Sequence, residues 1–422
     1  MENTDSNIKI GFVVFYPFHY YVYKNVYKHI RNEAEFIIDM GAFFPTEQPA
    51  ELLEDTIHLL QKEKVNFRTL YFQDYLEKGS LESFLSKYVV LVSVWRRGCI
   101  VHPCAKEKRR VHMTYGIGKD LGTYAVGNRM YDLILSHGKR DHDIFSMYTT
   151  AEIVGNPKFD DWFNGNFDSE LLKSLSRRLD KNKKTILYLP THGDLSSIDE
   201  LADELKKVSS LYNIIVKFHY YTPREEPERV KKLQDQRMIA FRDDTDLLSL
   251  LRVADLVISD NSSAIFDAIL ADKPLLVTDF LSKEYLDVEH KKPKYYRRGI
   301  ARISTYSGSI EQRIKQDKLI VKIENPSQLQ NGIRQALKDD KYFKDERKKL
   351  RDRLFSFQDG NSGKRAATAI KKLIDTALPE RPLFYHLLED RKRSQERRRQ
   401  KNQRNLYGYI KDFWKGLDEY FH

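Results

Sequence analysis

Short apolar runs of strand length alternate with charged stretches of helical length along most of this sequence. In the first half, KIGFVVFY (9–16) has the composition of a buried strand, and YKNVYKHIRNEA (23–34) carries apolar residues at helical spacing. The runs EFIIDM, FRTLYF, YVVLVSVW and YDLILSH follow, several of them separated by charged segments. This rhythm predicts βαβ units and a parallel sheet.

The rhythm is interrupted once and then restarts. Gly155-Asn156-Pro157 is a strong turn signal, and residues 164–183 are polar and charged. Helical stretches then separate five further strand-like runs, namely KTILYLP (184–190), NIIVKFH (213–219), MIAF (238–241), DLVISD (255–260) and PLLVTD (274–279). We therefore predict two doubly wound α/β domains facing a cleft, at 1–163 and 164–378, followed by a helical tail at 379–422.

Composition supports a mostly globular chain. Of the 422 residues, 41% are hydrophobic, which is enough for packed cores. The N-terminal stretch lacks the basic start of a secretory signal, and no apolar run approaches the length of a membrane span. We expect a cytoplasmic protein in which the only two cysteines, Cys99 and Cys104, are reduced and structural.

The net charge of +11 is concentrated near the C-terminus. Residues 391–404 hold eight Lys and Arg against a single Glu, and the following stretch places Leu406, Ile410, Phe413 and Leu417 at helical spacing. A basic segment beside an aromatic-rich amphipathic helix is typical of a peripheral membrane anchor. We expect 389–422 to bind an anionic surface on the inner face of the cell membrane. The alternative is a helix packed on the body, and no stacking platform or known fold supports nucleic-acid binding.

Polar residues follow several strands of the second predicted domain. Ligands of open α/β sheets bind at the carboxyl ends of the strands, so these residues are candidate ligands. The candidates are Thr191 and His192 after the first strand, Lys217 and His219 at the end of the second, Asp260, Asn261, Ser262 and Ser263 after the fourth, and Asp267 in the helix that follows.

Each of these residues also has a structural interpretation. Ser262 would cap a helix well, yet the free N–H groups and small hydroxyls at such a terminus also suit a phosphate. Asp267 either faces solvent or contacts a ligand hydroxyl. Lys217 and His219 either serve the fold or hold a diphosphate and stabilise a leaving phosphate.

The first predicted domain carries one rich stretch, RRVHMTYGIGKDLG (109–122). It offers His112, Tyr115, Lys119 and Asp120 around a Gly-Ile-Gly turn, but the glycine spacing is too weak to indicate a dinucleotide fingerprint. His19 and His137 each stand near the end of a predicted strand. These residues are candidates for the opposite wall of the cleft.

Several of these stretches together resemble the CDP-glycerol glycerophosphotransferase family, the teichoic-acid primases and polymerases. The similar stretches are ISDNSSAIFDAILADKPLLV, ILYLPTHGD, VKFH, VGNPKFD and FSFQDGNSGKRAATAI, in the family's order between about 109 and 377. The resemblance implies a GT-B-like fold. It also implies donor phosphate and ribose contacts at Ser262, Ser263 and Asp267, and a pocket lined by Thr191, Lys217 and His219.

Two stretches depart from the family pattern. Where the family carries Trp-His-Gly, with the histidine as presumed base, this chain has Thr114-Tyr115-Gly116. The family's Pro-Thr-Trp-Arg becomes Pro-Thr-His-Gly-Asp. Either His112, Asp120 or His137 takes the place of the missing base, or the chain uses a different donor.

The leading hypothesis is a transferase that moves glycerol phosphate or ribitol phosphate from a CDP-activated donor to a hydroxyl of a lipid-linked or glycan acceptor and releases CMP. The alternatives are a GT-B glycosyltransferase that uses a nucleotide sugar, and a catalytically inactive membrane-associated family member. The hypothesis requires no cofactor. A Mg²⁺ ion on the donor diphosphate is compatible with it, but no metal-binding cluster in the sequence supports one.

Overall fold

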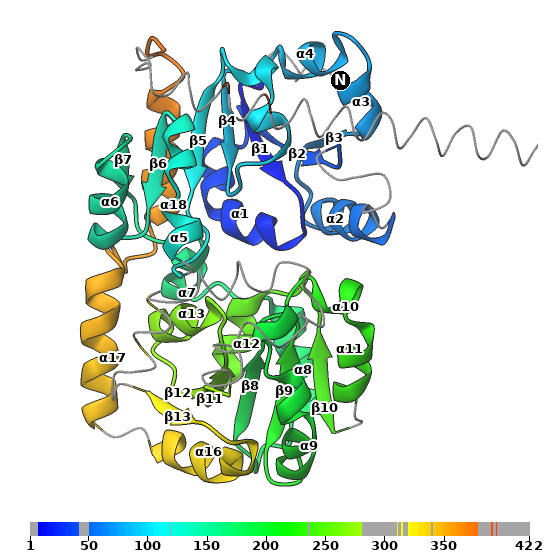
Figure 1. The fold of residues 1–422 in the computed structure, drawn as a ribbon, viewed down its shortest axis with the longest axis vertical. Helices are drawn as coiled ribbons and strands as arrows, with labels where there is room; N and C mark the ends of the chain where they lie inside the picture. The colour runs from blue at the N-terminus through cyan, green and yellow to red at the C-terminus, as the bar shows by residue number, and fades with distance from the viewer. Residues whose placement is uncertain are drawn as a thin grey trace, which may run out of the picture.

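The computed structural model describes residues 7–41, 50–118, 120–234, 237–280, 320–338 and 341–378, with the single positions 310, 314, 390 and 394. These residues form two lobes, each built on a parallel sheet (Figure 1). The expected tail at 379–422 and Lys119 lie outside the described residues, apart from two positions of the tail. Among the helices that the structure describes, none is both long and apolar enough to cross a membrane.

The first lobe contains a seven-stranded sheet in the order β3-β2-β1-β4-β5-β6-β7. Its strands are β1 (Ile10–Val14), β2 (Ala34–Asp39), β3 (Phe67–Leu70), β4 (Val90–Ser93), β5 (Arg109–Met113), β6 (Leu133–Ser136) and β7 (Ala151–Ile153). Its helices are α1 (Phe18–Ile30), α2 (Ala50–Lys62), α3 (Phe72–Leu76), α4 (Ser80–Leu85), α5 (Asp120–Thr123) and α6 (Lys139–Ser146).

The second lobe contains a six-stranded sheet in the order β10-β9-β8-β11-β12-β13. Its strands are β8 (Thr185–Leu189), β9 (Asn213–Lys217), β10 (Met238–Phe241), β11 (Leu256–Ser259), β12 (Leu275–Thr278) and β13 (Val321–Ile323). Its helices are α8 (Ser169–Arg178), α9 (Ile198–Val208), α10 (Thr222–Glu225), α11 (Pro227–Leu233), α12 (Leu247–Val253), α13 (Ala264–Leu270) and α16 (Leu329–Lys338).

The central strands are apolar along their whole length because helices cover both faces of each sheet. Every residue of β1 and of β11 is buried, so neither strand shows the alternation of a half-exposed strand. In each sheet the strand order reverses direction beside the first strand, which is the doubly wound arrangement expected from the sequence. Loops at the carboxyl ends of the strands therefore meet at one edge of each sheet.

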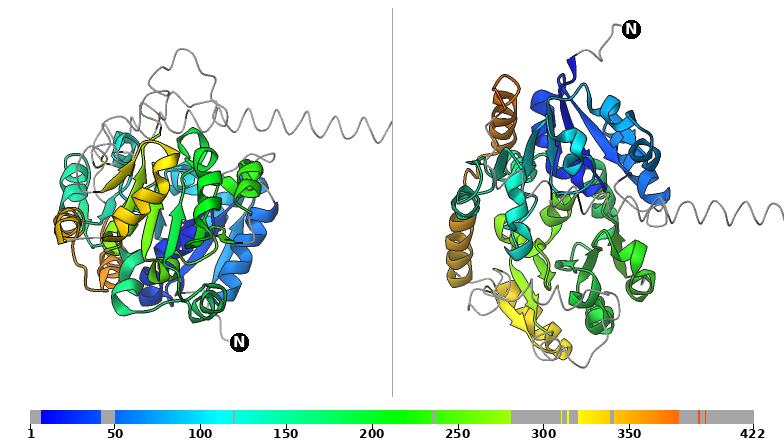
Figure 2. Two further views of the ribbon diagram at one scale, coloured as in Figure 1. Left: turned by 90° about the horizontal axis from the view of Figure 1, so that it is seen from below. Right: turned by 45° about the horizontal axis from the view of Figure 1, so that its top comes forward.

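Within the described residues, the chain crosses between the lobes twice. The first crossing runs through residues 154–159 into α7 (Asp160–Asn164), and the second follows α17 (Lys341–Leu354) back toward the first lobe. Figure 2 shows the last described helix, α18 (Ser362–Lys372), beside the first lobe. The predicted second domain, 164–378, includes this helix, and here the structure differs from the prediction.

The reason for the difference is the small apolar face of α18. Ala366, Ala367 and Ile370 are buried in the core of the first lobe. Gly363 lies so close to α1 that a Cβ atom there would sit 2.1 Å from the carbonyl oxygen of Asn25. The small side chains on this face allow α18 to pack closely against the first lobe. The described chain after the second lobe therefore returns to the first lobe and packs in its core.

Candidate functional site

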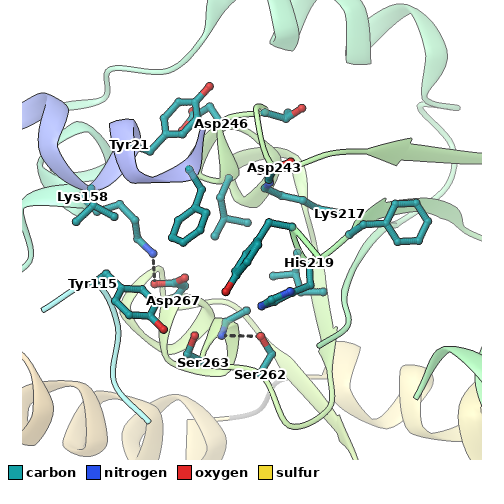
Figure 3. Close-up of a pocket in the computed structure, with 18 of the residues that line it drawn as sticks. Tyr21, Tyr115, Lys158, Lys217, His219, Asp243, Asp246, Ser262, Ser263 and Asp267 are labelled. Atoms are coloured by element: carbon teal, nitrogen blue, oxygen red, sulfur yellow. Dashed lines mark hydrogen bonds and ion pairs between the residues drawn. The ribbon is translucent and has the colours of Figure 1, made fainter. Parts of the chain in front are cut away.

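A cavity, partly open to solvent, lies between the two lobes. The second lobe contributes the loops after β8, β9, β10 and β11, and the first lobe contributes α1 and the loop after β5 (Figure 3). Seven of the residues predicted from the sequence line it, namely Tyr115, Thr191, Lys217, His219, Ser262, Ser263 and Asp267. The convergence of strand ends thus brings together most of the candidates from the second domain.

The two serines differ in what their hydroxyls do. Ser262 Oγ accepts a hydrogen bond of 3.2 Å from the N–H of Ala264, whereas the side chain of Ser263, the N-cap residue of α13, makes no capping bond. The N–H groups of Ile265 and Phe266 donate to carbonyl oxygens within the same turn. The three N–H groups that begin this seven-residue helix are therefore engaged, and the terminus offers the cavity serine hydroxyls.

Asp260 holds the wall of the cavity from behind. Its carboxylate accepts hydrogen bonds from the N–H groups of Thr191 at 2.9 Å, Ser197 at 2.9 Å and Asn261 at 2.6 Å. Asn261 in turn donates through Nδ2 to the carbonyl oxygen of Leu195 at 2.8 Å. Both side chains are buried and do not line the cavity, so they join the loop after β8 to the loop after β11 and position Thr191.

His219 faces the serines with a defined tautomer. The N–H of Tyr221 donates to Nδ1 of His219 at 3.3 Å, so in the neutral ring the proton resides on Nε2. Figure 3 shows the ring beside Ser262 at the edge of the cavity. The ring therefore offers an N–H donor where the serines offer hydroxyls.

Lys217 lines the cavity at the end of β9. Its ammonium donates to the carbonyl oxygen of Arg242 at 2.8 Å. Burial lowers the pKa of Lys217, and the carboxylates of Asp243, Asp244 and Asp246 partly offset that effect. The lysine is thus a positive charge of the cavity wall that acidic neighbours already balance in part.

Asp267 forms an ion pair with Lys158 at 2.6 Å between Oδ1 and Nζ. Burial raises the pKa of the Asp267 carboxyl, and the Lys158 ammonium partly offsets this rise. Lys158 belongs to the crossing between the lobes, while Asp267 belongs to α13. The pair therefore joins the crossing segment to the floor of the cavity.

Tyr115 reaches the cavity from the first lobe. Its side chain is 38% exposed and lies 6.1 Å from the ring of Phe18, measured between ring centroids. The same loop crosses the cleft: a Cβ atom on Gly116 would contact Ser263 Oγ at 3.5 Å, and Ile117 is buried in the core of the second lobe. Tyr115, at the position where the family's presumed base was expected, therefore lies directly over the serines, and its side chain is a phenol.

The match to known sequences falls on this part of the chain. Residues 119–296 match the family described as CDP-Glycerol:Poly(glycerophosphate) glycerophosphotransferase. This segment is similar to the glycerophosphotransferase family. The match confirms the family recognised from the motifs. The teichoic acid glycerol-phosphate primase of Bacillus spizizenii is 32% identical over 168 residues, which are 37% of this chain and 42% of the primase, so the aligned part spans less than half of that relative.

Solved structures share the fold over most of this chain. The wall teichoic acid polymerase TagF, in a structure soaked with CDPG, has a TM-score of 0.56 at 16% identity and covers 88% of this chain and 90% of its own. S. aureus MnaA with UDP has a TM-score of 0.54 at 12% identity, covering 89% and 99% of the two chains. The two parallel α/β lobes thus form a GT-B-like fold, as the family resemblance implied.

The three residues predicted as alternative catalytic bases, His112, Asp120 and His137, do not line the cavity. His112 is buried in β5, where its Nδ1 lies 3.1 Å from the carbonyl oxygen of Ser93. Asp120 forms an ion pair with Arg140 at 2.9 Å. His137 is buried beside Phe355, at 6.1 Å between ring centroids. None of these three described residues lines the cavity.

Two other predicted histidines support the cavity from outside it. His19 is fully buried in α1, accepts a hydrogen bond of 3.1 Å from the N–H of Phe15, and packs edge-on against Trp95 at 4.7 Å between centroids. His192 is buried and stacks on the imidazole of His219 at 3.9 Å. His192 therefore contacts a cavity residue without lining the cavity itself.

Several cavity residues were missed by sequence reasoning. They are Phe18, Tyr21 and Lys24 of α1, Lys158 of the crossing segment, and Asp243 and Asp246 of the loop after β10. Lys158 lies inside the family-like stretch VGNPKFD, which was the one available signal. The sequence of α1 has the pattern of an ordinary amphipathic helix. Such a pattern does not show which helix faces the other lobe, so its cavity residues could not be predicted.

The arrangement suits a ligand that carries both phosphate and hydroxyl groups. Serine hydroxyls and the His219 N–H offer donors at one end, where phosphate oxygens accept hydrogen bonds. The carboxylates of Asp243, Asp246 and Asp267 also line the cavity. Each already has partners in the protein, namely Arg224, the first turn of α12 and Lys158, and its remaining lone pairs can accept from ribose or alditol hydroxyls. Apolar side chains such as Phe18, Phe218 and Leu248 exclude water between them.

Proposed function

We propose that this chain transfers a phospho-alditol, glycerol phosphate or ribitol phosphate, from a CDP-alditol to a hydroxyl of a lipid-linked or glycan acceptor. The acceptor oxygen forms a bond to the β-phosphorus, the bond between that phosphorus and the bridging oxygen breaks, and its electron pair leaves with CMP. The acceptor's proton passes to a base or to solvent. The reaction consumes no oxidant or reductant.

The residues of the second lobe have distinct parts in this proposal. The hydroxyls of Ser262 and Ser263 hydrogen-bond the donor phosphates, and His219 donates from Nε2 to the bridging oxygen or the transferred phosphate. Such donors stabilise negative charge as it develops on the leaving CMP. Asp267 and Thr191 orient the ribose and the phosphates, so that catalysis depends mainly on placement and charge stabilisation.

One observation carries the proposal: the loop of Tyr115 and Gly116 lies over Ser263, so near that a Cβ atom added to Gly116 would be in van der Waals contact with the serine side chain. A donor phosphate on the serines would therefore face the first lobe directly, where an acceptor hydroxyl must approach. The family match over 119–296 supports CDP-glycerol as the first donor to test.

The decisive assay measures CMP release from CDP-glycerol and CDP-ribitol in the presence of acceptor lipids. We expect turnover with one of them, and a loss of at least tenfold in kcat/KM for S262A/S263A. Ser210→Ala is the matched control, because that hydroxyl lies at the exposed end of α9 and donates to the carbonyl oxygen of Lys207. Turnover of a nucleotide sugar in place of both CDP-alditols would contradict the proposal, and nucleotide binding without any turnover would favour an inactive family member.

We also propose that the basic segment 389–422, outside the described residues apart from 390 and 394, binds anionic membranes peripherally. Deleting it should leave a folded protein with weaker binding to anionic liposomes. Liposome binding that is unchanged by the deletion would contradict this part of the proposal.

A further inference from the structure

The imidazole of His219 has two close ring neighbours and a third, Tyr221, at 5.8 Å between centroids. The ring centroid of His192 lies 3.9 Å away in a stacked arrangement, and that of Tyr220 lies 4.1 Å away. His192 and Tyr220 are 6.4 Å from each other, so they contact different sides of the imidazole. The orientation of His219 therefore depends on both neighbours.

Tyr220 also contacts the opposite lobe. Its ring lies 4.4 Å from the ring of Tyr16 and 4.9 Å from the ring of Phe18, the latter at an interplanar angle of 26°. Trp95 adds a further ring at 6.0 Å. A single side chain thus touches His219 on its own lobe and an aromatic cluster on the first lobe.

The backbone of Tyr220 is held across the cleft as well. Arg224 donates through Nη1 to the carbonyl oxygen of Tyr220 at 2.6 Å and through Nη2 to the carboxylate of Asp55 at 2.9 Å. Asp55 belongs to α2 of the first lobe, and the Arg224 side chain is almost fully buried. Arg224 also donates to the carboxylate of Asp243 on its own lobe at 3.1 Å, so the carbonyl group of Tyr220 is linked to the first lobe only through Arg224, whereas the ring contacts that lobe directly.

We propose that Tyr220 is a positioning residue that orients His219 for phosphate transfer only while the two lobes are closed on each other. The inference rests on the proposed function, in which His219 contacts the transferred phosphate or the leaving nucleotide. Ring contacts of this kind weaken within an ångström or so of separation, so a parting of the lobes removes the support from Tyr220. The reacting groups are then brought into line only when the acceptor side of the cavity is in place.

Kinetics of two variants distinguish this role from simple packing at the lobe interface. Y220L removes the ring, and we expect kcat to fall at least tenfold while the KM for the donor changes less than threefold. Y220F keeps the ring and should stay within threefold of the wild type. Tyr342→Leu, on the exposed face of α17, is the matched control for loss of a tyrosine ring. A rise in KM with unchanged kcat in Y220L would overturn the proposal.

A variant on the other lobe tests the link itself. F18L removes the ring that stacks on Tyr220, so kcat should fall in this variant too. The double variant F18L/Y220L should be no worse than Y220L, because both changes break the same chain of contacts. Full additivity of the two losses would show that Phe18 acts independently and would overturn the proposed link.

A measurement without turnover separates this inference from the proposed function. In protein labelled with ¹³C-histidine, the Cε1–H signal of His219, assigned with H219N, should move in Y220L and in F18L but not in Y220F. If the wild type turns over neither CDP-alditol, the proposed function fails while this signal still tests the positioning role. A signal that stays in place in both Y220L and F18L overturns the positioning role, whatever the donor proves to be.

Discussion

Lys158 and Asp267 are joined by an ion pair of 2.6 Å across the junction between the crossing segment and α13. Each side chain is only 13% exposed, so the pair is largely removed from water. Charges in such a place depend on each other, because the loss of one leaves the other buried without compensation. The pair therefore links the crossing segment to α13, and the Lys158 ammonium opposes the rise that burial imposes on the pKa of the Asp267 carboxyl.

Lys158→Met should destabilise the protein by about 3 kcal/mol, since it leaves the Asp267 carboxylate buried without its partner. The double variant K158M/D267N should recover part of that loss, because the amide carries no charge. Urea denaturation of these two variants and of a control variant measures the free energy of unfolding. Lys173→Met is the control: its pair with Glu170 is exposed, and its loss should cost less than about 0.5 kcal/mol. Equal losses in K158M and K173M would contradict the interpretation.

Tyr115→Phe should lower kcat at least tenfold, because the phenol hydroxyl is the group that the first lobe places over the serines. Tyr115→His should retain activity and add a limb near pH 6.5 to the profile of kcat/KM, where an imidazole titrates. Tyr71→Phe is the control, since Tyr71 is an exposed tyrosine of the first lobe that does not line the cavity. Wild-type kinetics in both Tyr115 variants would exclude a role for this side chain in proton transfer.

Strands could be predicted where the sequence shows a short apolar run, whether the strand is fully buried, as β1 is, or partly exposed, as β10 is. β1, β8 and β11 read as continuous apolar runs and were located to within a few residues. β5 was missed because it begins with Arg109 and Arg110, and charged residues at its start hide the strand pattern. β7 and β13 have three residues each and are too short to carry a periodic signal.

The part of the site that could be predicted is mainly the wall formed by the second lobe. Strand ends of one sheet converge, so Thr191, His219 and Ser263 could be grouped from the order of strands alone. The same argument placed His137 in the cleft, but the side chain packs inward against Phe355, because a strand end does not determine the direction of the next side chain. Lys158 faces the cavity through the packing of two lobes, which no local pattern encodes.

The stability of the protein should fall as the pH drops below about 6.5. Burial lowers the pKa of His19 and His137 to about 3 and that of His112 to about 4, whereas an exposed histidine titrates near 6.5. Between these values the unfolded chain binds protons that the folded chain excludes. Each histidine therefore removes about 1.4 kcal/mol of stability per pH unit of acidification in this window.

Asp141 acts in the opposite direction. Burial raises its pKa to about 6, so the folded chain takes up a proton there before the unfolded chain does, and acidification toward pH 4 adds stability. Three histidines outweigh one aspartate, and D141N should make the acid loss steeper. Urea midpoints at pH 7.5, 6.5, 5.5 and 4.5 measure both slopes. Midpoints that stay level between pH 7.5 and 4.5 would contradict the burial of neutral histidines.

Gly155→Ala should destabilise the crossing between the lobes. Gly155 has a φ of +86°, and a Cβ atom there would lie 2.3 Å from Ser362 Oγ and 2.9 Å from the carbonyl oxygen of Ser356. The left-handed backbone costs a non-glycine residue about 1 kcal/mol, and the backbone contact cannot relax by side-chain rotation, so the total should reach about 2–3 kcal/mol. Gly165→Ala is the matched control, because its φ is +72° and no atom lies within 4 Å of its Cβ position. Urea denaturation should show a loss of about 1 kcal/mol for G165A, and a loss in G155A no larger than that would mean that the crossing segment adapts to the added methyl group.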